Sequence, residues 1–75
     1  STRLLLREPD LATAARIATV IDSALGKGTA RVEDPGAVAL TLKDTTAGGV
    51  MAVARVRELV VRRELPARIV IDGRD

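Results

Sequence analysis

The side chains that could carry chemistry in this sequence are carboxylates, arginines and two serines. The 75 residues include no histidine, cysteine or tyrosine, so the groups that most often act as bases or nucleophiles near neutral pH are absent. Neither Ser1 nor Ser23 stands in a nucleophile motif, and the ten carboxylates are scattered, mostly beside arginines, as is typical of ion pairs. We therefore predict no catalytic residue, no metal ligand and no cofactor, and a protein that is not an enzyme.

Gly26-Lys27-Gly28 is the segment whose composition comes nearest to a phosphate-binding loop. In such loops the glycines precede a helix, so that backbone N–H groups at the helix N-terminus face the phosphate. Here they follow the helix expected at residues 11–25, and a C-terminal cap is the favoured interpretation. Their spacing also differs from the GXXG loop of RNA-binding KH domains. Because the chain has no aromatic side chain, it cannot stack on nucleobases.

The charge is nearly balanced, with 12 basic and 10 acidic residues and a net charge of +2. Arginines are loosely clustered in the second half of the chain, and acidic residues interrupt the cluster. Its members are Arg55, Arg57, Arg62, Arg63 and Arg68, with Glu58 and Glu64 between them. The pattern favours a solvated face of mixed charge over a polyanion site, and we expect no nucleic-acid partner. Since arginine is enriched at protein interfaces, these five residues are the candidates for a subunit interface.

The apolar residues, 47% of the chain, are numerous enough for one hydrophobic core, and we expect residues 1–75 to form a single domain. With no aromatic residue, leucine, valine, isoleucine and alanine must fill that core, and Met51 is the one flexible filler. No apolar run reaches the ~18 residues that a membrane-spanning helix needs, so we expect no membrane insertion.

Hydrophobic periodicity predicts four strands and two helices. The expected order is a strand at 2–8, a helix at 11–25, strands at 29–33 and 37–43, a helix at 47–58 and a strand at 67–72. Asp10 caps the first helix and Asp44-Thr45-Thr46 the second, because short polar side chains accept from first-turn amides. Asp34-Pro35-Gly36 predicts a type II-like turn with positive φ at Gly36. Residues 59–62 form either a last helical turn or a short extra strand, and the β-branched Val60 and Val61 favour the strand.

This order predicts an α+β fold, a two-layer β-α-β-β-α-β sandwich with two helices on one face of a mostly antiparallel sheet. Right-handed crossovers place the first strand beside the third, with its hairpin partner outside. In the second helix, Val50, Val53, Ala54 and Arg57 share one side. The order β-α-β-β-α-β with both helices on one face of the sheet is typical of ferredoxin-like domains and of ring-building modules.

Several segments of the chain resemble the flagellar P-ring protein family. In that family an apolar strand ends in an arginine, a Pro-Asp step follows, and a helix begins with Thr-Ala. The matching segments are Leu5-Leu6-Arg7-Glu8-Pro9-Asp10-Leu11 with Thr13-Ala14, Arg16-Ile17-Ala18 with Ile21, Gly28-Thr29-Ala30 with Asp34 and Val38, Val60-Val61, and Pro66-Ala67-Arg68-Ile69-Val70-Ile71-Asp72 with Arg74. The sequence departs from the family at Leu11, where an aromatic is usual, and at Met51-Ala52-Val53, which replaces a bulkier pattern.

The resemblance implies a structural role in the bacterial flagellar basal body. P-ring subunits assemble in the periplasm as a ring around the rod, at the peptidoglycan layer and below the L-ring. The implied partners are therefore further copies of the same protein, with the rod, the L-ring protein and peptidoglycan as neighbours. It also implies that residues 1–75 are one domain of a longer ring-forming protein.

Two other interpretations fit the same order of elements. A small ferredoxin-like regulatory or ligand-binding domain would have nearly the same topology, but it would need a set of polar loop residues that the sequence does not offer. A KH-like RNA binder would need the GXXG loop and the stacking side chains that are missing.

Overall fold

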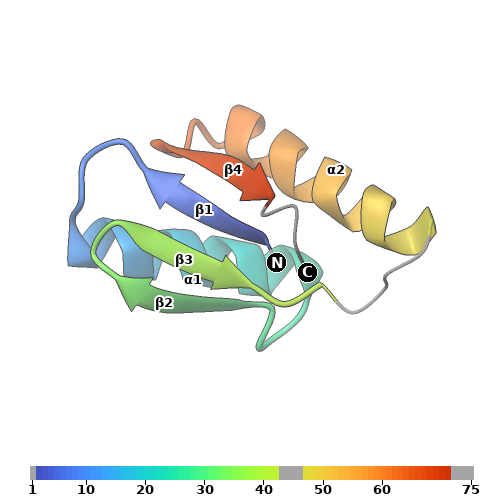
Figure 1. Cartoon of the computed structure of the whole chain (residues 1–75), viewed down its shortest axis with the longest axis horizontal. Coiled ribbons are helices and arrows are strands. Elements are labelled where there is room, and N and C mark those ends of the chain that lie inside the picture. The colour runs from blue at the N-terminus through green and yellow to red at the C-terminus, as the bar shows by residue number, and fades with distance from the viewer. Residues whose placement is uncertain (1, 43–46, 72–75) are drawn as a thin grey trace.

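The structure is a computed structural model, and it describes residues 2–42 and 47–71. Within these residues the chain forms four strands and two helices in the order β-α-β-β-α-β (Figure 1). Their bounds are β1 Thr2–Leu6, α1 Leu11–Leu25, β2 Ala30–Asp34, β3 Ala37–Leu40, α2 Ala47–Arg62 and β4 Ala67–Ile71. The predicted caps at Asp44-Thr45-Thr46, and the predicted strand ends at Lys43 and Asp72, lie outside the described residues.

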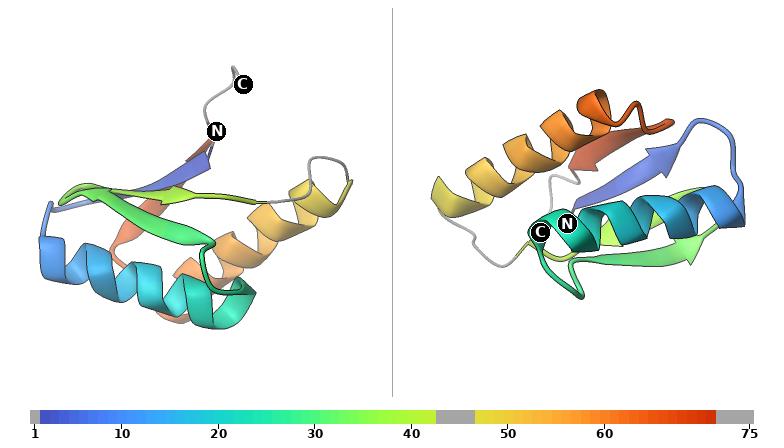
Figure 2. Two further views of the ribbon diagram at one scale, coloured as in Figure 1. Left: turned by 90° about the horizontal axis from the view of Figure 1, so that it is seen from below. Right: turned by 180° about the vertical axis from the view of Figure 1, so that it is seen from behind.

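The strands of the described part form one antiparallel sheet in the order β2-β3-β1-β4, with β2 and β4 at its edges. Both helices lie on the same face of this sheet (Figure 2, left), and no described helix or strand lies on the other face. The helix α1 packs against β2 and β3, and α2 packs against β4. The predicted two-layer α+β fold is therefore confirmed, and so is the place of β1 beside β3 with β2 outside.

The hydrophobic core lies between the sheet and the helices and consists of aliphatic side chains. Alternation along β1 and β3 turns every second residue toward the helices, while helical spacing brings one stripe of α1 against the sheet. Burial of a leucine, isoleucine or valine side chain stabilises a fold by roughly 1.5–3 kcal/mol. The buried members of the core are Leu4, Leu6, Ala14, Ile17, Ile21, Val38, Leu40, Val56, Leu65 and Ala67.

The two ends of α1 are set by Asp10 and Gly26, as predicted. The Asp10 carboxylate accepts hydrogen bonds from the backbone N–H of Thr13, at 2.9 Å, and from the Thr13 hydroxyl. The N–H of Gly26 donates to the carbonyl of Asp22 at 2.8 Å, and φ of Gly26 is 120°, a region that glycine reaches without steric cost. These two residues fix α1 at fifteen residues.

The turn between β2 and β3 differs from the predicted one. Positive φ occurs among the described glycines at Gly26 and Gly28, and not at Gly36, so the type II-like turn was wrong. Instead Oδ1 of Asp34 accepts the Gly36 N–H at 2.8 Å. The aspartate side chain supplies the hydrogen bond that shapes the turn, and the left-handed glycine is not needed. A register shift between Val32 and Asp34 accompanies it.

The helix α2 is longer than predicted: residues 59–62 form its last helical turn, and the favoured extra strand was wrong. The helix continues to Arg62 because Leu59 and Val60 extend its buried side beyond Val56 and pack against the core. Beyond it, Glu64 takes φ 53°, and the Leu65 N–H donates to the Val60 carbonyl at 2.9 Å. This hydrogen bond and the left-handed residue before it form a Schellman C-terminal motif.

Candidate interaction surfaces

The five arginines that the sequence groups together are separated in space by the rotation of α2. Arg55 and Arg62 lie on the side of α2 that faces α1. Nη2 of Arg55 donates to the carbonyl of Ala24 in α1 at 3.2 Å, and Nε of Arg62 lies 3.1 Å from Oε2 of Glu58. Both guanidinium groups are thus engaged within the domain. The Arg62 pair is largely exposed, so its contribution to stability is small.

The other three arginines occupy three different surroundings. Arg57 lies on the opposite side of α2 from Arg55, Arg63 follows the helix near Arg16, and Arg68 stands in β4. All three are exposed. The cluster seen in the sequence is therefore not one patch on the surface.

A different set of arginines lies on the uncovered face of the sheet. Arg3 of β1 pairs in register with Ala39 of β3, and Arg31 of β2 pairs with the same alanine, so the two arginines lie in one row across the sheet. Arg68 lies in the next row, opposite Leu5. We call Arg3, Arg31 and Arg68 the sheet-face arginines.

These arginines share their face with one acidic residue and with small or aliphatic side chains. Nε of Arg3 lies 4.0 Å from Oε1 of Glu33, a partly exposed pair that is worth little in water. Arginine beside half-buried apolar residues such as Leu5 and Val70 is the composition of a protein interface. Sequence reasoning missed Arg3 and Arg31. Their alternation with the inward-facing residues of β1 and β2 was the signal that could have identified them.

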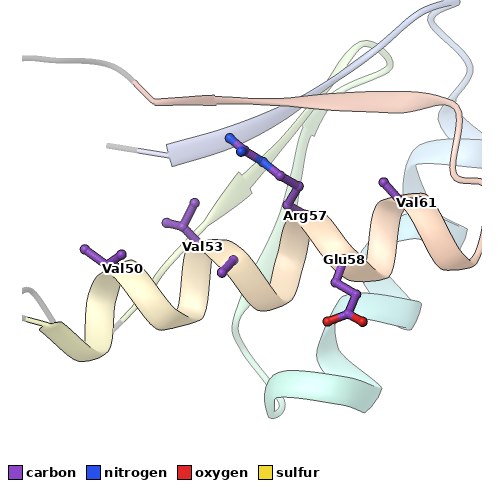
Figure 3. A pocket seen from close by; sticks show the side chains of 6 residues that line it. Val50, Val53, Arg57, Glu58 and Val61 are labelled. Atoms are coloured by element: carbon purple, nitrogen blue, oxygen red, sulfur yellow. The ribbon is translucent and has the colours of Figure 1, made fainter.

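A second surface is a shallow apolar groove along α2. It is lined by Val50, Val53, Ala54, Arg57, Glu58 and Val61. Val50, Val53, Arg57 and Val61 project from one side of the helix, and Glu58 projects from another (Figure 3). Val50 is 71% exposed and Val61 is 70% exposed. The shared side predicted for Val50, Val53, Ala54 and Arg57 thus exists, and it is not the side that packs on the sheet.

The pKa of Asp10 is lowered, first by the hydrogen bond from the Thr13 hydroxyl and then by that from the Thr13 backbone, and this carboxylate is the helix cap. No group of three or more potential metal-ligating side chains occurs within residues 2–42 and 47–71. Of the helices in this part, none is long and apolar enough to cross a membrane.

Comparison with known protein families matches residues 1–75 to the family described as flagellar P-ring protein. The chain belongs to the flagellar P-ring protein family. The P-ring proteins of three bacteria illustrate the similarity: 40% identity with that of Geobacter sulfurreducens, 43% with that of Anaeromyxobacter dehalogenans and 36% with that of Thermotoga petrophila, over 96%, 95% and 99% of this chain.

The chain spans only part of these P-ring proteins. It covers 20%, 19% and 23% of the lengths of the same three relatives. No solved structure matches the chain. The family assignment therefore rests on the sequence, and it agrees with the resemblance carried by the segments around Pro9-Asp10 and Pro66-Ala67.

Proposed function

We propose that this chain is a non-catalytic structural domain of the flagellar basal body and forms part of the P-ring in the periplasm, around the rod. The observation that carries the proposal is the family match over all of residues 1–75, with relatives that are 36–43% identical. Because those relatives are about five times as long, we further propose that residues 1–75 are one domain of a longer ring-forming polypeptide.

The neighbours in such a ring are other copies of the same polypeptide, and the uncovered sheet face is the surface that we assign to one of them. Arg31 and Arg68 are exposed there, and Arg3 lies between them in the sheet. Guanidinium groups bind carboxylates with paired, oriented hydrogen bonds, so an acidic surface of the adjacent copy fits this face. The rod, the L-ring protein and peptidoglycan are further neighbours that membership of the ring would bring.

Of the five arginines in the sequence cluster, Arg68 is the one that lies on the proposed sheet-face interface, whereas Arg63 lies beyond the end of α2 near Arg16. Arg55 and Arg62 are engaged inside the domain, by Ala24 and Glu58. Removal of either would therefore alter the domain itself as well as any contact. Arg57 lies in the apolar groove of α2, which is a separate surface.

Location in the basal body is tested directly. Flagellar basal bodies are purified from the bacterium that makes this protein, and an antibody raised against residues 1–75 is applied in immuno-electron microscopy. Labelling of the ring around the rod supports the proposed function. Its absence from basal bodies that carry a complete P-ring would refute it.

The interface is tested by charge reversal in the complete polypeptide. Arg31→Glu combined with Arg68→Glu should reduce ring assembly and swimming in soft agar. Arg16→Glu combined with Lys27→Glu makes the same change in charge at exposed positions on the helix side and should leave both unchanged. Equal effects of the two double variants would show that net charge, and not the sheet face, controls assembly.

A further inference from the structure

The side of α2 that carries the groove is the side turned away from α1. Positions 50, 53, 54, 57 and 61 fall within an arc of about 100° around the helix axis, at 100° per residue. Arg55 and Arg62 lie outside this arc, and Arg55 contacts α1. Val56 is fully buried and lies on the sheet side. The groove side therefore faces outward beyond β4, the edge strand against which α2 packs.

The edge of the sheet and the groove of α2 thus lie next to each other (Figures 1 and 3). In the described part of the chain, β4 pairs with β1 on one side and has no strand on the other. Ile71, which stands on the helix side of β4 in register with Thr2, is 56% exposed. An unpaired strand edge beside an apolar helix side is the arrangement left when a sheet lacks its outermost strand.

The groove of α2 and the strand β4 are similar in length. From Val50 to Val61 the helix rises by about 16 Å, at 1.5 Å per residue. A strand covers that distance with about five residues at roughly 3.3 Å each. The strand β4 itself has five residues. One strand of about this length, laid along β4, would therefore also be long enough to cover the groove of α2.

We propose that a fifth β-strand, supplied by a part of the same polypeptide outside residues 1–75, pairs with β4 and covers the groove formed by Val50, Val53, Ala54 and Val61. The inference rests on the proposal that this chain is one domain of a longer P-ring polypeptide. The relatives offer ample length for it, because residues 1–75 correspond to only about a fifth of each. The side chains that this strand turns toward α2 are apolar, with one carboxylate at the level of Arg57.

The charge of Arg57 decides between this occupant and a second copy of the chain. No carboxylate of the described residues lies within ion-pair distance of Arg57, while Glu58 pairs with Arg62. Two copies joined symmetrically at their β4 edges would bring two Arg57 side chains together near the middle of the joined grooves. Like charges in that position repel. A strand that carries a carboxylate instead gives Arg57 a partner of opposite charge.

The test uses thiol labelling of the complete polypeptide, and this domain has no native cysteine. Val61→Cys places a thiol in the groove, and Met51→Cys places one on another side of the same helix, where the native side chain is 64% exposed. The reagent is 5,5′-dithiobis(2-nitrobenzoic acid). We expect the Val61→Cys thiol to react at least about tenfold more slowly than the Met51→Cys thiol, because it reacts only when the strand opens. Val50→Cys is a second groove position if Val61→Cys does not fold.

Three results would overturn the proposal. Equal labelling rates would show an uncovered groove. Protection that disappears on dilution would assign the cover to a second copy. Protection of the thiol together with fast hydrogen exchange at the β4 amides that do not bond to β1 would show a cover that is not a paired strand. Each result is independent of whether the protein is found in basal bodies, so failure here leaves the proposed function standing.

Discussion

The backbone N–H of Ala30 donates a 2.8 Å hydrogen bond to Oδ1 of Asp22, eight residues earlier, and joins the start of β2 to the last turn of α1. Oδ2 of the same carboxylate accepts the N–H of Gly28 at 3.2 Å. Gly28 has φ 89°, a left-handed conformation suited to glycine. One side chain therefore satisfies two backbone donors in the connection between helix and sheet.

Replacement of Asp22 should destabilise the domain. Asp22→Ala removes both acceptors, and hydrogen bonds to a charged group contribute about 1.5–3 kcal/mol, so we expect a loss of about 2 kcal/mol in the free energy of unfolding. Urea denaturation followed by far-ultraviolet circular dichroism measures it. The neighbouring Ser23→Ala, at an exposed position, is the control and should change stability little. Equal values for the two variants would contradict the role of the carboxylate.

Replacement of Glu64 by glycine should stabilise the domain. Its φ of 53° is left-handed, which costs a residue with a Cβ atom about 1–2 kcal/mol. Glycine loses part of that advantage through its greater freedom in the unfolded chain, so Glu64→Gly should stabilise by about 0.5–1 kcal/mol. Arg63→Gly, one residue earlier and without positive φ, should destabilise. A lower Tm for Glu64→Gly in calorimetry would argue against the Schellman motif.

The cap of α1 should be sensitive to acid. Hydrogen bonds from Thr13 lower the pKa of Asp10 below the ordinary value of 3.8, so the folded state favours the ionised carboxylate. A lowered pKa gives stability that is present above the unfolded value and is lost as the pH falls through the folded value. The Tm of the native protein should therefore exceed that of Asp10→Ala at pH 7, and the difference should shrink at pH 2. A difference that is constant with pH would exclude this linkage.

Replacement of the core residue Ile17 should strongly destabilise the domain. This side chain is fully buried between α1 and the sheet, and Ile17→Ala should cost about 2–5 kcal/mol through lost burial and the cavity left behind. For a domain of this size such a loss is a large share of the total stability. Leu11→Ala, at a position that is more than half exposed, should cost far less. If the two variants unfolded at the same urea concentration, the assigned core would be contradicted.

Binding to nucleic acid should be weak and independent of sequence. The net charge is only +2 and stacking side chains are missing, so we expect a Kd no tighter than about 10 µM for single-stranded RNA near 150 mM salt. Fluorescence anisotropy with two RNAs of unrelated sequence measures it. Sub-micromolar affinity for one of them alone would favour the KH-like interpretation instead.

The sequence predicted the first helix to the residue because three signals coincide there: an N-cap at Asp10, a broad apolar stripe and a stop at Gly26. It failed at the end of the second helix because Val60 and Val61 have strand propensity, while the packing of Leu59 and Val60 on the core decides for helix. Local propensity and tertiary burial disagreed at that point, and burial prevailed.

The candidate surfaces were harder to predict than the fold. Residues close in sequence, such as Arg55 and Arg57, are turned to different sides by about 100° per residue of helix. Residues far apart, such as Arg3 and Arg68, come onto one face only through the register of the sheet. Strand pairing is set by long-range contacts, and alternation alone indicates a shared face only once the strand order is known.

The register shift at Val32 and Asp34 makes the two borders of the sheet unlike. Glu33, between these two residues, makes a bulge that interrupts the regular row of backbone donors and acceptors, and the charged Arg31 lies close by, so the β2 border is a poor template for another strand. The β4 border has no such interruption against β1. A regular extension of the sheet is therefore possible at β4 and not at β2, which agrees with the proposed fifth strand. If two isolated domains were joined at β4 despite the repulsion between their Arg57 side chains, the pair would expose only its two β2 edges, and fibre growth by this route would stop there.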